Sequence, residues 1–203
     1  MKTLTSFLCI AVLFLSGCAS SLMKPAEEQA LKPPPAETSR VIFLRPSSFG
    51  GAIQAPLFDV SDGKPVFLGV SSVGTKIVYD TTPGKHHFMV VSEAADFLNA
   101  ELAAGKTYYA VVAPRMGLWK ARFSLWPVKA DRKAKYSLKD KGFPSWLEEG
   151  KLVANTPKGE RWARDNAEDI QVKYSTYKEI WDRKTDEAQE KRTLEAEDGV
   201  SVR

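Results

Sequence analysis

The sequence predicts a mainly β fold, an antiparallel β-sandwich or barrel followed by a C-terminal helical extension. Between residues 40 and 129, short apolar runs alternate with turn residues, which is typical of such folds. The connections between these runs are too short for helical crossovers, so neighbouring strands are expected to be mostly antiparallel. Beyond residue 129 the chain is rich in charged residues, with apolar residues at helical spacing. We therefore divide the chain into four segments: 1–17, 18–39, 40–129 and 130–203.

The first segment is predicted to be an export signal. Lys2 is followed by the apolar run "FLCIAVLFL", residues 7–15. This run is shorter than the roughly 20 residues that a membrane-spanning helix needs. The end of the run overlaps "LSGC", residues 15–18, which resembles the lipobox of bacterial lipoproteins. In a lipobox the cysteine is acylated and becomes the mature N-terminus. Cys18 is therefore the expected lipidation site, and the alternative is a secreted protein with an unrelated cysteine near its cleavage site.

The resemblance to lipoproteins also implies a location. Two or three fatty-acyl chains such as palmitate would hold the domain stably, whereas a single chain holds only marginally. Residue 19 is Ala rather than Asp, which in Gram-negative lipoproteins favours the outer membrane, and we expect its periplasmic face. Cys9 would leave with the signal peptide, so the mature chain would contain no intramolecular disulfide.

Residues 19–39, "ASSLMKPAEEQALKPPPAETS", contain few branched or aromatic apolar side chains and no sustained period. Such a segment buries too little apolar surface to offset its ordering entropy. We predict a flexible tether of about 20 residues with a root-mean-square span of roughly 25 Å, stiffened by its proline run.

The predicted sandwich opens with "RVIFLRP" (40–46) and has single strands at "TKIVYD" (75–80) and "GKHHFMVVS" (84–92). Residues 56–70, "PLFDVSDGKPVFLGV", predict a hairpin that turns at 61–64. Residues 97–114, "FLNAELAAGKTYYAVVAP", predict a second hairpin joined through 103–106, where Gly105 supplies the turn conformation.

The last predicted strand of the sandwich is "LWKARFSLW", residues 118–126. Its side chains alternate with a period of two. The core face would carry Trp119, Ala121, Phe123 and Leu125, and the solvent face Lys120, Arg122 and Ser124. Seven or eight strands result.

Three stretches, "RVIFLRP", "TTPGKHHFMVV" and "LAAGKTYYAVVA", together resemble a group of small uncharacterised bacterial lipoproteins that carry a domain of unknown function. The turn from Pro83 to His86 also resembles the PEGA-type sandwich, which is related to carboxypeptidase regulatory domains. The resemblance covers about residues 40–128. It implies an immunoglobulin-like or prealbumin-like β-sandwich without enzymatic activity, and it assigns no functional residue.

In the extension, Thr156 and Pro157 are suited to the N-cap and first position of a helix. Apolar residues follow at spacings of four and three, and "TDEAQEKRTLEAEDGVSVR" after them predicts a solvated helix end and frayed tail. The stripe consists of Ala163, Ala167, Ile170, Tyr174, Tyr177 and Trp181. It either packs on the sandwich or on residues 143–153, or it binds an envelope protein or a second copy of the chain through Ile170, Tyr174, Tyr177 and Trp181.

The sequence contains few candidates for a catalytic, metal-binding or cofactor-binding site. His86 and His87 are neighbours in a predicted strand and point to opposite faces, so we expect no shared metal ion. "GVSSVG", residues 69–74, lacks the spacing of a nucleophile elbow and predicts a turn. Neither a phosphate-binding loop nor a dinucleotide-binding glycine pattern is present, and we expect no cofactor.

The formal net charge is +4 and the sequence pI is about 9.0. Residues 131–203 are about neutral, so the excess lies on the sandwich and its tether. It forms either a basic face for anionic envelope material or an ordinary spread of surface charge. The contributing cations include Lys64, Lys76, Lys85, Lys106, Arg115, Lys120, Arg122 and Lys129. The export signal argues against nucleic acid as a partner.

The sequence therefore favours a lipid-anchored, non-enzymatic structural or protein-interaction module of the envelope. The alternative is an envelope or cell-wall hydrolase, which would need two carboxyl groups roughly 5 to 10 Å apart. The carboxylates of the β region are Asp59, Asp62, Asp80, Glu93, Asp96 and Glu101. A third hypothesis, a carrier of a soluble ligand, requires an interior cavity.

Overall fold

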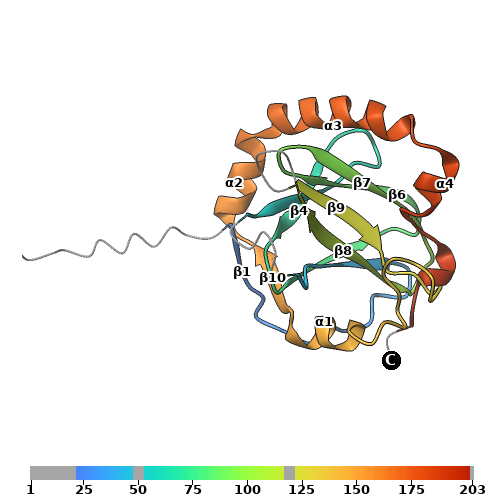
Figure 1. Cartoon of the computed structure of the whole chain (residues 1–203). Helices are drawn as coiled ribbons and strands as arrows, with labels where there is room; N and C mark the ends of the chain where they lie inside the picture. Colours follow the sequence, from blue (N-terminus) through green and yellow to red (C-terminus); the bar gives the residue numbers. More distant parts are fainter. Residues whose placement is uncertain (1–21, 48–52, 117–121, 202–203) are drawn as a thin grey trace, which may run out of the picture.

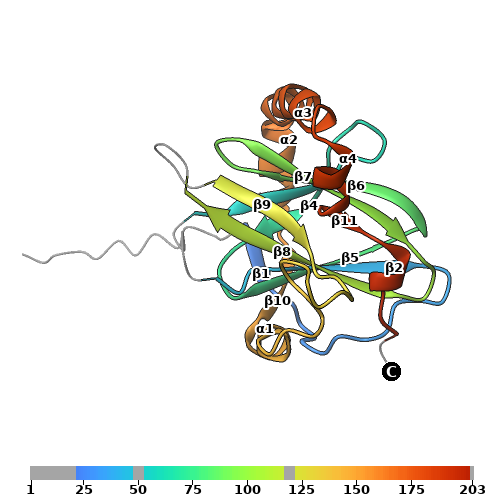
Figure 2. The ribbon, with the colours of Figure 1, turned by 45° about the vertical axis from the view of Figure 1, so that its right-hand side comes forward.

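Two facing β-sheets form the centre of the molecule (Figures 1 and 2). The computed structural model describes residues 22–47, 53–116 and 122–201. Within them, a six-stranded sheet has the order β1-β10-β5-β2-β8-β9 and a five-stranded sheet the order β11-β7-β6-β3-β4. The mainly β class predicted from the sequence is confirmed.

The strands are β1 Met23–Pro25, β2 Ser39–Leu44, β3 Ala55–Asp59, β4 Val66–Ser71, β5 Thr75–Thr81, β6 Gly84–Val91, β7 Ala95–Leu102, β8 Thr107–Arg115, β9 Arg122–Pro127, β10 Lys151–Asn155 and β11 Thr193–Leu194. The helices are α1 Phe143–Glu149, α2 Pro157–Asp165, α3 Ala167–Asp182, α4 Asp186–Glu190 and the 3₁₀ helix η1 Ala196–Asp198.

The main core lies between the two sheets. Alternate side chains of the strands point into it, as the period-two patterns predict. Phe43 of β2 and Phe88 of β6 meet there edge to face, with ring centroids 5.3 Å apart. Most strand pairs are antiparallel, but β2 with β8, β5 with β10 and β7 with β11 are parallel. Parallel pairs arise where the two strands are far apart in the chain.

The hairpin predicted at residues 56–70 is confirmed, since β3 and β4 pair antiparallel. Its turn contains Gly63 with φ of 75°, a conformation that favours glycine. The second predicted hairpin is wrong. β7 belongs to the five-stranded sheet and β8 to the six-stranded one, so residues 103–106 form a corner between sheets. Gly105 supplies a positive φ of 68° at this corner.

The predicted pattern of β9 holds for its core face, because Phe123 and Leu125 are buried between the sheets. Its other face is more buried than predicted. Ser124 is buried and Arg122 is half-buried. The reason is that the outer face of this sheet is covered by segment 128–147. Residues 118–121 of the prediction lie outside the described residues.

Residues 22–39 do not form the predicted tether. β1 pairs antiparallel with β10, and Met23 is buried in the main core, where its sulfur accepts a hydrogen bond from the Val70 N–H. Residue Leu31 packs on the outer face of the six-stranded sheet. The segment is ordered because the folded domain, and not the segment itself, provides the apolar surface on which it packs.

Residues 130–203 are more than a helical extension. They supply β10 to one sheet and β11 to the other, and Val200 forms an antiparallel bridge with Thr107. The predicted frayed tail is therefore wrong, and Leu194 in it is fully buried. The predicted cap is confirmed: the Thr156 hydroxyl accepts a 3.1 Å hydrogen bond from the Gly159 N–H.

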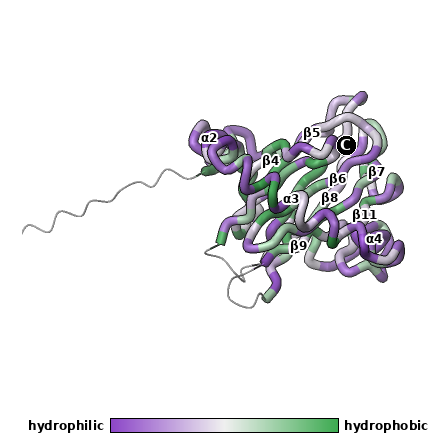
Figure 3. The backbone as a smooth tube through the Cα atoms, turned by 90° about the horizontal axis from the view of Figure 1, so that it is seen from above, coloured by the Kyte–Doolittle hydropathy of each residue, from purple (hydrophilic) through white to green (hydrophobic). Residues whose placement is uncertain are grey.

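The helices cover the outer faces of both sheets, giving a layered molecule with α2 and α3 on the five-stranded sheet and α1 on the six-stranded one (Figure 1). Seen from above, hydrophobic strands occupy the centre, and the hydrophilic helices α2 and α4 lie at the edges (Figure 3). No helix in the described part of the chain has the length and apolar character needed to cross a membrane.

Candidate functional site

The four residues predicted to bind a partner lie between α3 and the five-stranded sheet. Ile170 and Trp181 are buried, and Tyr174 and Tyr177 are half-buried. The Phe97 ring lies 5.8 Å from Trp181 and 6.1 Å from Tyr174, between ring centroids. The stripe thus packs on the sandwich, one of the two alternatives open from the sequence. Residues 143–153 lie on the opposite sheet (Figure 1). Cys18 lies outside the described residues.

Arg192 fixes the end of this helical layer. Its guanidinium forms an ion pair with Asp96 and donates a 3.0 Å hydrogen bond to the Phe97 carbonyl. It also lies over the Trp126 ring at 4.3 Å and the Trp181 ring at 5.6 Å. Because the arginine is buried and joins three elements, we assign it a structural role.

The two histidines point to opposite faces of β6, as predicted. His87 faces α3, stacks on Phe97 at 4.9 Å and hydrogen-bonds Asn99 through Nδ1 at 2.7 Å. Burial lowers the pKa of His87 to about 4. The ring is therefore neutral at pH 7 and belongs to the core beneath the helix.

His86 lies in a polar pocket of about 260 Å³ at the end of the sandwich that carries the 61–64 turn. Its Nε2 is 2.9 Å from the Thr82 carbonyl oxygen, and its Nδ1 is 3.2 Å from a carboxylate oxygen of Asp59. The Ser61 hydroxyl donates to the other Asp59 oxygen. The hydrogen bond with Asp59 raises the pKa of His86. Burial opposes ionisation of Asp59, but bonds from His86 and Ser61 outweigh it, so the pKa of Asp59 is lowered.

This Asp–Ser–His cluster lacks the geometry of a hydrolase triad. In a triad, one imidazole nitrogen accepts the serine proton while the other donates to the aspartate. Here Ser61 and Asp59 both lie at Nδ1 of His86, and Nε2 faces the Thr82 carbonyl, so the serine and the aspartate do not occupy opposite sides of the ring. The Ser61 hydroxyl proton is directed to the carboxylate. The cluster therefore links a turn to a strand and provides no general base.

Three other carboxylates considered for a hydrolase site form ion pairs with arginine side chains. Asp80 accepts two hydrogen bonds from Arg40, Glu93 lies 3.8 Å from Arg122, and Asp96 pairs with Arg192. Each is a structural interaction at the sheet surface or under the helical layer. Among the described residues, no group of three or more His, Cys, Asp or Glu side chains is placed to hold a metal ion.

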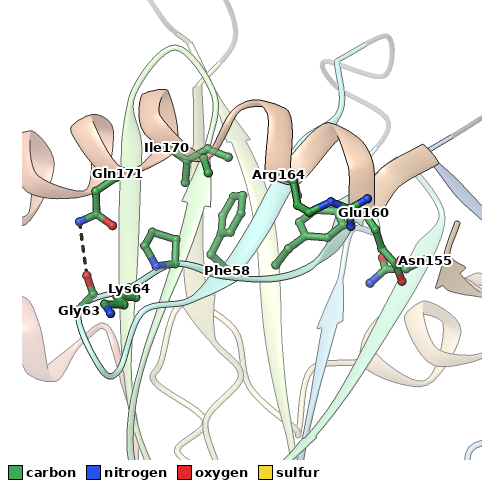
Figure 4. A pocket seen from close by; sticks show the side chains of 12 residues that line it. Phe58, Gly63, Lys64, Asn155, Glu160, Arg164, Ile170 and Gln171 are labelled. Atoms are coloured by element: carbon green, nitrogen blue, oxygen red, sulfur yellow. Dashed lines mark hydrogen bonds between the residues drawn. The ribbon is translucent and has the colours of Figure 1, made fainter. Parts of the chain in front are cut away.

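A groove of about 790 Å³ lies between the β3–β4 hairpin and the junction of α2 with α3 (Figure 4). Its volume falls within the range of ligand-binding clefts. The floor is apolar, formed by Phe58, Pro65, Phe67, Ala163, Ala167 and Ile170. The rim is polar, formed by Lys64, Asn155, Glu160, Arg164 and Gln171.

The groove exists because the predicted single helix is broken. Asn166 ends α2 and precedes α3, and its side chain donates a 2.7 Å hydrogen bond to the Trp162 carbonyl. Ala163 and Ala167 flank the break, and their small side chains leave the space open. At one end, Gln171 donates a 3.4 Å hydrogen bond to the Gly63 carbonyl and joins α3 to the hairpin turn (Figure 4).

Sequence reasoning missed this groove, since it assigned both alanines to the packing stripe. The available signal was their size, because two alanines in a stripe otherwise made of large side chains indicate a gap. Comparison with protein-family models and with curated proteins finds no match to this chain.

Proposed function

We propose that the protein is a non-enzymatic lipoprotein of the bacterial envelope, anchored through Cys18 at the periplasmic face of the outer membrane, and that it binds a protein partner in the groove. The observation that carries the proposal is the groove itself, an apolar floor open to solvent within a polar rim. The finer expectation of an immunoglobulin-like or prealbumin-like sandwich belongs to the same proposal. It is supported by the eight strands between residues 39 and 127.

The expected occupant is an extended segment of another envelope protein with one or two apolar side chains. Phe58 and Phe67 provide a surface for such side chains, and the alanines leave room for them. The rim carries cationic, anionic and amide groups: Lys64 and Arg164, Glu160, and Gln171. A polypeptide presents both donors and acceptors, so this mixed rim suits it better than a ligand of a single charge.

Photocrosslinking in intact cells tests the proposal. A photoreactive amino acid at Ala167, on the groove floor, is expected to capture the partner from the full anchored chain. The matched control is Glu168, the next residue of α3, which is exposed and does not line the groove. Ala167→Trp should fill the groove and abolish the adduct formed by a second photoreactive residue at Arg164. An adduct of the chain with itself would identify a second copy as the occupant.

Equal adducts from positions 167 and 168 would contradict the proposal, as would an unchanged adduct in the Ala167→Trp variant. Since Ala167 is exposed, this substitution does not disturb the core. A thermal unfolding curve equal to that of the wild type would confirm that the fold is intact.

A further inference from the structure

The N-terminal part of the domain is bound close to the predicted anchor. The Leu22 carbonyl accepts hydrogen bonds from the Thr156 N–H at 3.4 Å and its hydroxyl at 2.9 Å. From Met23 onward the chain is paired with β10. Only residues 19–21 therefore separate the described domain from Cys18, in place of the roughly 20 residues of a flexible tether.

This short connection limits the height of the domain above the lipid. From Cys18 to Leu22 an extended chain spans at most about 14 Å. The interfacial layer of a bilayer is itself about 6 Å thick on each side. A compact domain of this size is about 40 Å across. Because the reach is much smaller than the domain, the domain cannot turn freely, and the side that carries Leu22 must face the lipid.

The residues around Leu22 identify that side. Leu22 lines a pocket with Gln54 and Ser92. Glu93, next to Ser92, pairs with Arg122, which lies opposite Arg115 in the β8–β9 register. We define the anchor-side rim as Ile53, Gln54, Ser92, Glu93, Arg115 and Met116. It lies at the end of the sandwich opposite the 61–64 turn and the 103–106 corner.

The anchor-side rim has the chemistry of a lipid-facing surface. Met116 is 81% exposed and Ile53 is 37% exposed, and both are among the few large apolar side chains that the described residues expose. Arg115 beside Met116 is exposed, as is Arg161 on α2. Apolar side chains with adjacent cations suit the boundary between acyl chains and anionic headgroups.

We propose that the anchor-side rim rests on the membrane in which Cys18 is acylated, so that the domain has one fixed orientation on the lipid. The inference rests on the proposed lipid anchor but not on the proposed partner. In this orientation the Glu160 end of the groove is near the lipid and the Lys64 end faces away, because α2 follows the residue that holds Leu22.

Site-directed fluorescence quenching tests the orientation. The acylated mature chain has no other thiol. Met116→Cys and Ile53→Cys, made as separate variants, therefore each place a single probe on the anchor-side rim. Ala104→Cys places the same probe at an exposed position of the far corner. The full chain is reconstituted in phosphatidylethanolamine and phosphatidylglycerol vesicles that contain a headgroup nitroxide lipid. Quenching should be about threefold stronger at the anchor-side rim than at residue 104, since the length of β8, about 26 Å, separates residue 104 from the lipid-facing end.

A lengthened connection is the matched control. A flexible Gly/Ser insert of about 20 residues before Leu22 adds roughly 25 Å of span and should reduce rim quenching to the level at residue 104. Persistent quenching at the anchor-side rim with this insert would contradict the argument from reach, because the short connection would then not be what orients the domain.

Equal quenching at residues 104 and 116 in acylated, vesicle-bound protein would overturn the orientation and leave the anchor intact. Absence of labelled fatty acid on the wild-type chain, with the protein soluble, would overturn the anchor and the orientation together.

Discussion

His87 makes the stability of the domain fall as the pH falls. In the folded protein its pKa is lowered to about 4, because the ring is buried beneath α3. In the unfolded chain an ordinary histidine has a pKa near 6.5. Below about 6.5 the unfolded chain therefore binds a proton that the folded protein does not, and the equilibrium shifts toward unfolding.

The size of this effect follows from the two pKa values. Between pH 7 and pH 5 the unfolded imidazole becomes almost fully protonated while folded His87 stays mostly neutral. The free energy of unfolding should fall by about 2 kcal/mol, or roughly 20-fold in the equilibrium constant. His86 acts in the opposite direction, because its raised pKa adds stability as the pH falls through it. The His87 effect must therefore be isolated by substitution.

The double variant His87→Phe with Asn99→Leu provides this isolation. A phenyl ring keeps the stack on Phe97, and replacing both hydrogen-bond partners leaves no unpaired buried amide. Urea unfolding is measured at pH 7 and pH 5 for this variant and for the wild type. Between pH 7 and pH 5, the free energy of unfolding of the variant should rise by about 2 kcal/mol relative to that of the wild type. An unchanged difference between the two proteins would refute the assignment of a neutral, buried His87.

Three other substitutions test structural interactions. Asp59→Asn should lower the pKa of His86 in an NMR titration and cost about 1–3 kcal/mol below pH 6.5, a cost that shrinks as the pH rises through the folded pKa of His86; an unchanged His86 titration would contradict this. Arg192→Met should cost about 3–5 kcal/mol in urea unfolding, because a buried carboxylate loses its partner, and a loss below about 1 kcal/mol would show that Asp96 is solvated. In Gly159→Ala the new methyl group would overlap the Leu22 carbonyl oxygen. It should displace β1, at a cost of about 1–3 kcal/mol, and accelerate cleavage after Glu28 by a glutamate-specific protease; a resistant variant would show that this contact is easily relaxed.

Local chemistry predicted the turns and caps of this fold correctly. The hairpin at 61–64, the Thr156 cap and the opposite orientation of His86 and His87 all depend on residues close in sequence. The 103–106 turn shows the limit. Gly105 permits the same local conformation whether the chain returns in its own sheet or crosses to the other, and only packing between distant strands decides.

The short strands could not have been predicted. β1 and β11 contain three and two residues, too few for any periodic pattern. They form because completed sheet edges offer them backbone partners. The groove depends equally on long-range assembly, since segments 58–67, 155 and 160–171 come together only after folding. The sequence contains Asn166 and the two alanines and predicts the 56–70 hairpin, but nothing in it places the hairpin opposite the break between the helices.

The pairing of β1 with β10 sets an order for biogenesis. Leu22 and Thr156, which it joins, are 134 residues apart. The first strand can therefore pair only after most of the chain has been made, and contacts of such long separation form late. Until then the edge of β10 is open to pairing with other chains. Under the proposed lipid anchor at Cys18, the contact that closes the domain would therefore form within a few residues of the lipid.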